Sequence, residues 1–176
     1  MLERFYPDRM ADSAYGIDYE ELYGRGYRGI IYDVDNTLVE HGAPATKRAV
    51  ELFERLHGIG FSAVLLSNNR EPRVKSFAED VRYADYIFKA GKPSARGYRE
   101  AMRRMGTDER NTLFVGDQLF TDVWGAKNAG IYSILVKPIH PKEEIQIVLK
   151  RQLEKIVLYF YRRKKGRGKD DDGRIY

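Results

Sequence analysis

Five short apolar segments that alternate with helical patterns constrain the fold of this chain more than any other feature of its sequence. The segments cover residues 29–34, 61–66, 86–88, 112–115 and 132–136. Their richness in Ile, Val and Leu is typical of strands that are buried on both faces of a parallel sheet. Repeated strand and helix units of this length predict an α/β fold, a three-layer α/β/α parallel sheet with right-handed crossovers.

Helical patterns fill the intervals between the predicted strands. The first has apolar residues at helical spacing over residues 45–56, followed by glycines that close the helix. The second covers residues 72–81, and the third covers residues 94–105. The fourth is expected to begin near Thr121, a favourable N-cap residue, and to end at Gly130.

The polar and charged residues that could bind a ligand or take part in catalysis lie directly after the predicted strands. In open α/β sheets, ligands bind beyond the carboxyl ends of the strands, near the point where the strand order reverses. Four of the five predicted strands are followed by such residues: Asp33 and Asp35, then Ser67, Asn68 and Asn69, then Lys92, then Asp117. The sequence therefore predicts one polar site along the carboxyl edge of the sheet.

Asp33 and Asp35 form the most informative pair in this set. Side chains alternate along a strand, so carboxylates two residues apart point the same way and repel each other unless a cation or a shared proton offsets the repulsion. Such a pair suggests a metal site, or a nucleophile working with an acid/base. Alone the pair is equally compatible with an ordinary turn, because Asp and Asn often form turns at strand ends.

Oxygen ligands for a hard divalent ion are available from the aspartates of this edge. Asp33, Asp35 and Asp117 are candidates for binding Mg²⁺, which usually keeps several waters and meets substrate phosphate. Asp122 is a further candidate because it could orient a metal-bound water. The alternative for Asp122 is an acidic residue that only stabilises a helix N-terminus.

Two further segments could hold a phosphate group. Ser67 could donate its hydroxyl beside the backbone amides of Asn68 and Asn69, although these residues also suit a plain turn. Lys92 could neutralise phosphate charge as a point cation, and the alternative is a solvated lysine. Together these residues give the predicted site the means to bind a phosphorylated substrate.

The order of these motifs along the chain resembles that of a known superfamily. Asp-x-Asp-x-Thr, Ser-Asn, Gly-Lys-Pro and Gly-Asp-x-x-x-x-Asp are similar to the four motifs of the haloacid-dehalogenase-like (HAD) hydrolases. The strings DVDNTL, LLSNN, GKP and GDQLFTDVWGAKNAG resemble the small subclass III A phosphatases of the YqeG type. That group is similar to the mitochondrial phosphatidylglycerophosphate phosphatases, and the likeness covers residues 11–163, nearly the whole chain.

The resemblance implies both a fold and a mechanism. The fold is a HAD-like sheet with the order 5-4-1-2-3 in the numbering of the predicted strands. The mechanism is phosphomonoester hydrolysis through an aspartyl-phosphate, with Asp33 as the nucleophile and Asp35 as the acid/base. The implied Mg²⁺ ligands are Asp33, the Asp35 main-chain carbonyl and Asp117, with Asp122 in the outer region of the ion. The implied phosphate-binding residues are Ser67, Asn68 and Lys92.

The spacing of the motifs leaves no room for a cap domain over the site. About six residues separate Thr37 from the first predicted helix, and 25 separate Ser67 from Lys92, an interval that already holds a helix and a strand. Capless members of the superfamily tend to act on large substrates, so the resemblance implies an open site, with phosphatidylglycerophosphate as the leading substrate. Two alternatives stay open: a phosphatase for a soluble or macromolecular phosphoester, and a non-catalytic receiver or RNA- or protein-binding module.

Composition and charge favour one globular domain with a short basic end. The 176 residues are 43% hydrophobic and 32% charged, and the lack of cysteine excludes disulfides, thiolate zinc sites and cysteine nucleophiles. Residues 162–176 hold seven Lys/Arg and three Asp, which leaves 24 bases against 23 acids elsewhere and argues against a nucleic-acid binder. We expect an N-terminal segment over residues 1–28 that packs on the core, a HAD-like phosphatase domain over residues 29–161, and a basic, disordered tail over residues 162–176.

A last helical pattern begins at about Glu143, and its first three turns are expected to pack on the sheet. Residues 156–161 are apolar all round and precede the basic run Arg-Arg-Lys-Lys. Such a segment could dock on anionic lipid, touch RNA or a partner protein, or stay solvated. Since the chain has no spanning segment and no signal-peptide core, we expect a cytoplasmic protein, peripheral at the inner face of the membrane.

Overall fold

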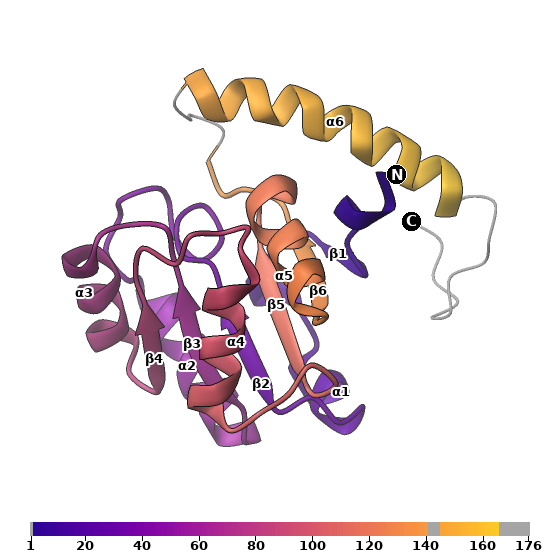
Figure 1. Cartoon of the computed structure of the whole chain (residues 1–176). Coiled ribbons are helices and arrows are strands. Elements are labelled where there is room, and N and C mark those ends of the chain that lie inside the picture. The colour runs from indigo at the N-terminus through magenta and orange to yellow at the C-terminus, as the bar shows by residue number, and fades with distance from the viewer. Residues whose placement is uncertain (1, 141–144, 166–176) are drawn as a thin grey trace.

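A six-stranded parallel sheet forms the middle of the molecule (Figure 1). The computed structural model describes the backbone of residues 2–140 and 145–165 and the side chains of residues 2–140 and 152–164. The strands are β1 (Arg9–Ala11), β2 (Gly29–Tyr32), β3 (Ser62–Leu66), β4 (Ala84–Ile87), β5 (Thr112–Gly116) and β6 (Tyr132–Val136). Their order across the sheet is β1-β6-β5-β2-β3-β4, and all neighbouring pairs are parallel.

The predicted order of the five apolar strands is confirmed. In the numbering of the predicted strands, β6-β5-β2-β3-β4 is the order 5-4-1-2-3. The strand β2 lies between β3 and β5, and its four residues are buried. A continuous apolar run is what a central strand needs, because helices cover both of its faces.

The edge strand β1 lies in the N-terminal segment, which we expected only to pack on the core. It pairs with β6, with Arg9 opposite Ile134. The carboxylate of Asp8 supports this pairing by accepting hydrogen bonds from the backbone amide and the hydroxyl of Ser133, both at 2.8 Å. The sequence Arg-Met-Ala contains no apolar run, so periodicity alone could not reveal this strand.

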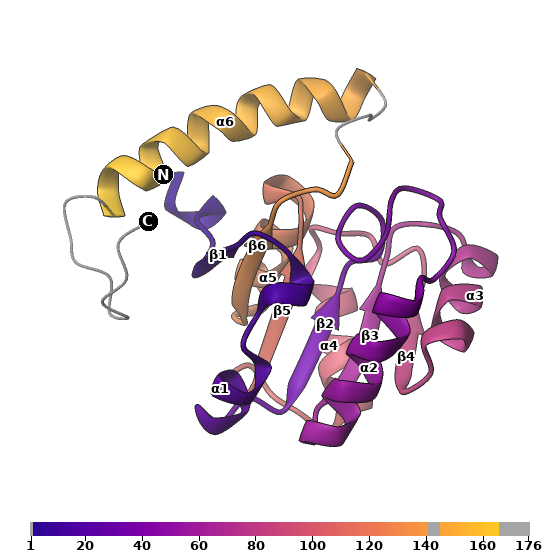
Figure 2. The same ribbon diagram turned by 180° about the vertical axis from the view of Figure 1, so that it is seen from behind.

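Helices cover both faces of the sheet, as the predicted three-layer fold requires (Figure 2). They are α1 (Tyr19–Gly24), α2 (Lys47–Ile59), α3 (Glu71–Val81), α4 (Ala95–Met105) and α5 (Trp124–Ala129), and a further helix, α6 (Ile145–Lys165), is described below. On one face Tyr32 of β2 packs in a core with Phe53 of α2. On the other face the adjacent Ile31 shares a second core with Tyr98 of α4. The alternation of side chains along β2 thus supplies both cores.

Short-range signals fix most of the helix ends. The side chains of Thr46 and Ser94 accept hydrogen bonds from the backbone amides of Ala49 and Arg96, so they are the N-caps of α2 and α4. Gly60 ends α2 with a φ of 112°, a left-handed conformation that favours glycine. These ends agree with the predicted helices to within a few residues.

The fourth helix was predicted to begin near Thr121 with that residue as its N-cap, and the N-cap assignment is wrong. Leu119–Val123 form a π-helical turn, η3, and α5 begins only at Trp124. The carboxylate of Asp122, inside this turn, accepts hydrogen bonds from the backbone amides of Asp117 at 3.2 Å and Gln118 at 3.1 Å, just before the turn. Thr121 therefore lies inside the turn and not at its N-cap, and its hydroxyl donates to the Gln118 side chain at 3.0 Å.

The helix α6 crosses the end of the molecule beside η1 (Leu2–Phe5) and η3 (Figure 1). Its buried side chains include Glu154, Val157 and Tyr161. The expected packing of its first turns on the sheet involves side chains that lie outside the described residues. Residues 162–165 continue the helix, so the predicted tail begins inside α6, and residues 166–176 lie outside the described part of the chain.

Candidate active site

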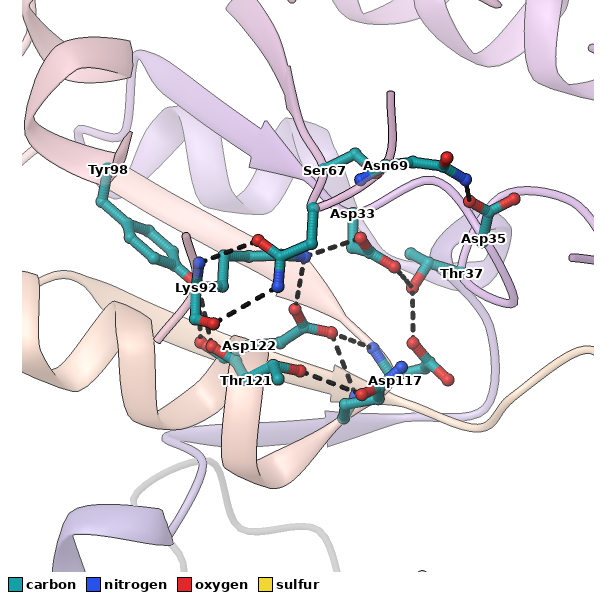
Figure 3. Close-up of polar contacts among 12 residues, drawn as sticks. Asp33, Asp35, Thr37, Ser67, Asn69, Lys92, Tyr98, Asp117, Thr121 and Asp122 are labelled. Carbon is teal, nitrogen blue, oxygen red and sulfur yellow. Dashed lines mark hydrogen bonds and ion pairs between the residues drawn. The ribbon is translucent and has the colours of Figure 1, made fainter. Parts of the chain in front are cut away.

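The predicted polar residues meet at the carboxyl edge of the sheet (Figure 3). Asp33 follows β2, Ser67 follows β3 and Asp117 follows β5, while Lys92 comes from the loop between β4 and α4. All four are buried, with 1% to 8% of their surface exposed. Within the described residues, no further domain is inserted between these strands and the helices that follow them, so the predicted absence of a cap is confirmed.

Lys92 lies between two carboxylates. Its ammonium donates to Asp33 Oδ1 at 2.6 Å and to Asp122 Oδ1 at 2.7 Å. The side chain of Asn68 fixes the backbone of this lysine, because it accepts from the Lys92 amide at 2.8 Å and donates to the Lys92 carbonyl at 3.3 Å. Lys92 is therefore a held, buried cation and not a solvated one.

Burial and charge oppose each other in this cluster. Burial lowers the pKa of Lys92, but the carboxylates of Asp122 and Asp33 outweigh it and hold that pKa above its ordinary value. Burial together with the Asp122 carboxylate raises the pKa of Asp33, although Lys92 acts in the opposite direction. The single positive charge of Lys92 thus does not fully compensate the negative charge of the carboxylates around it.

Asp33, Asp117 and Asp122 form a buried acidic cluster that could hold a metal ion. One carboxylate oxygen of each lies within 4.8 Å of the others. Three carboxylates and one ammonium give the cluster a formal charge of −2 when all are ionised. Buried charge of this size needs compensation, and a divalent cation with a preference for oxygen ligands supplies it. The donor set therefore fits a hard divalent cation.

Asp35 lies apart from this acidic cluster. Its carboxylate accepts from the Gly42 amide at 2.9 Å, the Asn69 side chain at 3.3 Å and the Arg73 guanidinium at 3.0 Å. Partial burial disfavours its charged form, yet the Gly42 amide and Arg73 together lower the pKa of Asp35. The expected repulsion between the two aspartates is thus relieved by separate cations, Lys92 for Asp33 and Arg73 for Asp35. The chain departs from the strand after Tyr32, and Asn36 takes a φ of 64°.

The structure is compatible with both predictions for Ser67, a turn residue and a donor to phosphate. Its hydroxyl oxygen accepts a hydrogen bond from the Asn69 amide at 3.1 Å, which is the expected turn. A hydroxyl that accepts one bond still has its O–H to donate, so Ser67 also retains the capacity to bind a phosphate oxygen. It lies in the same close-up as Asp33 and Lys92 (Figure 3).

A relative that matches the chain from end to end decides the family. The "Probable phosphatase YqeG" of Bacillus subtilis is 38% identical over 166 residues, which are 93% of this chain and 96% of that protein. The chain belongs to the HAD-like hydrolases. A family profile described as HAD-hydrolase-like matches residues 89–144 of it. This hydrolase is a phosphatase, as its likeness to a named phosphatase and its HAD-like fold both indicate.

More distant similarities agree with this family. The "Phosphatidylglycerophosphate phosphatase 1, chloroplastic/mitochondrial" of Arabidopsis thaliana is 25% identical over 159 residues, 84% of this chain and 44% of that protein. A HAD family hydrolase from Deinococcus radiodurans, solved with bound phosphate and sodium, has a TM-score of 0.57 at 14% identity. That alignment covers 72% of this chain and 88% of that structure, and it shows the same fold.

Four side chains of this HAD-like hydrolase were given no role by the sequence. The Thr37 hydroxyl lies 3.3 Å from Asp117 Oδ1 and 3.5 Å from Asp33 Oδ2. The Tyr98 hydroxyl lies within hydrogen-bond distance of the backbone carbonyls of Thr121 and Asp122, and so holds η3. Asn69 and Arg73 both bind Asp35. Thr37 lies within the quoted motif, whereas Arg73 meets a residue 38 positions away and leaves no local signal.

Gly116 lets the acidic cluster form at the end of β5. A Cβ at this position would lie 2.6 Å from Asp122 Oδ2 and 2.6 Å from the ring of Phe114. Any other residue would therefore push Asp122 away from the backbone amides that donate to it. The glycine of the Gly-Asp motif has a packing reason in this HAD-like hydrolase, and it supports the site without touching a ligand.

Proposed function

We propose that this phosphatase hydrolyses phosphomonoesters with Mg²⁺ through an aspartyl-phosphate on Asp33, and that phosphatidylglycerophosphate is its leading substrate. The observation that carries the proposal is the meeting of Asp33 with Lys92 and the acidic cluster at the carboxyl edge of the sheet. Asp33 lies with Lys92 and the acidic cluster, where phosphate and metal would meet, and Asp35 lies beside it with its own partners.

In the proposed mechanism the Asp33 carboxylate attacks phosphorus, and the bond between phosphorus and the leaving oxygen breaks. Although burial opposes them, the Gly42 amide and Arg73 lower the pKa of Asp35 in the free protein. Asp35 must therefore take up a proton when the substrate binds; it gives that proton to the leaving oxygen and the alcohol departs. Asp35 then takes a proton from a water molecule, whose oxygen attacks the phosphorus of the aspartyl-phosphate. This releases inorganic phosphate and restores Asp33. Dividing the displacement in two replaces one difficult step with two easier ones.

The remaining residues of the site position the phosphoryl group. Lys92 and the Ser67 hydroxyl would donate to its oxygens beside the Asn68 amide, so that catalysis consists mostly of orientation and charge neutralisation. Asp33, Asp117 and the Asp35 main-chain carbonyl would hold Mg²⁺, with Asp122 in its outer region. When bound, the ion supplies positive charge that neutralises the phosphate. The formal charge of the cluster supports this role.

The lipid substrate is supported by the open edge of the site and by α6. Figure 1 places α6 along the end of the sheet toward which β3 and β4 point, the end that carries the site. The helix exposes four large apolar side chains, Leu153, Ile156, Tyr159 and Phe160, which are 45% to 60% exposed. Exposed Arg162, Arg163 and Lys164 follow them. We infer that this surface contacts an anionic membrane, peripherally and from the cytoplasmic side.

No described segment is long and apolar enough to be a helix across the bilayer. The receiver-module alternative loses its basis, because the chain is a HAD-like phosphatase. A soluble or macromolecular phosphoester remains the second candidate, since an open site with no cap suits a large substrate as well as a lipid. Contact of the basic segment with nucleic acid is the less favoured alternative to membrane contact.

The test is phosphate release from phosphatidylglycerophosphate in mixed micelles, with and without Mg²⁺. Release should require Mg²⁺ and vanish in Asp33→Asn. p-Nitrophenyl phosphate serves as the soluble substrate in a parallel assay. Release only from the soluble ester would retain the phosphatase mechanism and exclude the lipid. Undiminished release by Asp33→Asn would contradict the proposed nucleophile.

A further inference from the structure

We propose that Arg73 forms an anion-binding subsite that selects phosphomonoesters whose leaving alcohol carries a second negative group, such as a phosphodiester or a carboxylate. The inference rests on the proposed function, because it takes Asp35 as the group that faces the leaving oxygen. It adds a substrate feature that the acidic cluster and Lys92 do not recognise.

Arg73 is held at the edge of the site by two contacts. It lies in the first turn of α3, and its Nη2 donates to Asp35 Oδ1 at 3.0 Å. Its guanidinium carbon lies 5.5 Å from the centre of the Phe77 ring, one turn further along the helix. The side chain is 18% exposed, so part of it still reaches solvent. A positioned, partly open guanidinium is suited to bind an arriving anion.

The guanidinium also has donor capacity to spare. Among the residues that the structure describes, Nε of Arg73 is buried and has no hydrogen-bond acceptor. A buried donor without an acceptor is unfavourable, and a small rotation of the planar group would offer Nε and an Nη together to two oxygens of one anion. Carboxylate and phosphate groups present their oxygens with the spacing that this pair of donors requires.

The position of Arg73 determines which part of a substrate it would meet. Lys92 is already occupied by Asp33 and Asp122, on the side where the phosphoryl group would be transferred. Figure 3 shows Asp35 turned away from Lys92, toward Asn69. Since the acid/base must face the leaving oxygen, its partner Arg73 lies on the side of the leaving alcohol. A second negative group on that alcohol would come within reach of Arg73 and stay remote from Lys92.

The alternative is that Arg73 only orients Asp35. In that case its removal would slow all substrates by the same factor, because every substrate needs the acid/base. A subsite makes a different prediction: removal of the guanidinium would penalise only substrates with a second anion. The ratio of kcat/KM between matched substrates therefore separates the two roles.

The experiment compares glycerol 3-phosphate, whose leaving alcohol is uncharged, with two substrates that add an anion. These are 3-phosphoglycerate, which adds a carboxylate, and the deacylated headgroup of phosphatidylglycerophosphate, which adds a phosphodiester. The full-length protein should prefer at least one of the anionic substrates by tenfold or more in kcat/KM, a factor that corresponds to about 1.4 kcal/mol. Arg73→Gln should abolish the preference and Arg73→Lys should retain part of it. Arg70→Gln removes an exposed guanidinium with no capping bond at the start of α3 and should leave the ratio unchanged.

A binding measurement keeps this inference separable from the proposed function. Calorimetric titration of Asp33→Asn, with and without Arg73→Gln, gives affinities for the same substrates in the absence of turnover. Tighter binding of an anionic substrate that is lost with Arg73→Gln supports the subsite even if no phosphate is ever released. Turnover with equal losses for all substrates in Arg73→Gln, and no change in relative affinity, would leave the phosphatase standing and overturn the subsite.

Discussion

Buried charge dominates the site at the scale of single residues. Lys92 is the cation that Asp33 and Asp122 share, and its side chain is only 4% exposed. A buried ion pair adds little net stability when both partners are present, but removal of one partner leaves an uncompensated charge and is strongly destabilising. The site is therefore sensitive to changes that alter the count of charges.

Replacement of Lys92 tests this balance. We expect Lys92→Met to lower the free energy of unfolding by about 3 kcal/mol in the absence of metal, because buried carboxylates lose their shared partner. Phosphate release should also fall. Urea denaturation in EDTA gives the stability, and Lys75→Met removes an exposed lysine as the control. A Lys92→Met protein as stable as the wild type would contradict this account of the charge balance.

Metal binding gives a second prediction at this scale. A ligand that binds only the folded protein stabilises it, by about 2.7 kcal/mol at a concentration one hundred times its Kd. Mg²⁺ should therefore raise the Tm of the wild type and have little effect on Asp117→Asn, which loses one charged oxygen of the cluster. Asp80→Asn, an exposed change on α3, should respond like the wild type. Equal shifts in all of these proteins would exclude the cluster as the site.

At the scale of elements, the packing of α4 against α5 positions Asp122. A Cβ on Gly125 of α5 would lie 2.4 Å from the hydroxyl oxygen of Tyr98, the group that holds η3. Glu154 of α6 also accepts a hydrogen bond from the Leu119 amide at the start of η3, at 2.9 Å. The acidic cluster thus depends on helices that carry none of its ligands.

Two glycine substitutions should have opposite effects. Gly125→Ala should lower the free energy of unfolding by about 1–3 kcal/mol through overpacking against Tyr98, and it should weaken the Mg²⁺-dependent rise in Tm. Gly58→Ala, inside α2 with open space around it, should raise stability by about 0.5–1 kcal/mol because alanine favours helix. Thermal and urea denaturation measure both. A Gly125→Ala protein as stable as the wild type would contradict the packing argument.

At the scale of the whole molecule, α6 connects the site to an exposed surface that is apolar and basic. Its inward side chains pack near η1 and η3, whereas its outward ones are apolar and end in basic residues. An amphipathic helix with bases at one end binds anionic lipid through both apolar burial and charge, and salt weakens the second contribution.

Vesicle binding tests this surface. The protein should sediment with phosphatidylglycerol vesicles and much less with neutral ones, and high salt should reduce the binding. Ile156→Asp or Phe160→Asp should weaken it at least tenfold, by placing a carboxylate in the apolar face. Tyr83→Asp changes an equally exposed aromatic residue at the far end of β4 and serves as the control. Unchanged sedimentation of the α6 variants would exclude the helix as a membrane contact.

The alternating pattern of strands and helices was sufficient to predict the α/β class and the edge on which the site lies, whereas the strand order was implied by the resemblance to the HAD-like hydrolases. Buried parallel strands must be apolar along their whole length, and right-handed crossovers then leave few strand orders open. The residues after those strands meet because all carboxyl ends lie at one edge. Asp33, Ser67, Lys92 and Asp117 were therefore brought together as predicted.

What only the tertiary structure decided are the partners of these residues. Asp33 meets Lys92 across 59 residues, Asp35 meets Arg73 across 38, and Asp8 meets Ser133 across 125, the contact that accompanies the unpredicted strand β1. Asp122 accepts a hydrogen bond from the Asp117 amide and shares Lys92, a double role that no spacing reveals. Local periodicity in the sequence indicates which face of an element is buried. These pairings depend instead on how elements distant in the sequence pack together. The compensation of charge in a buried site is therefore decided only by the tertiary structure.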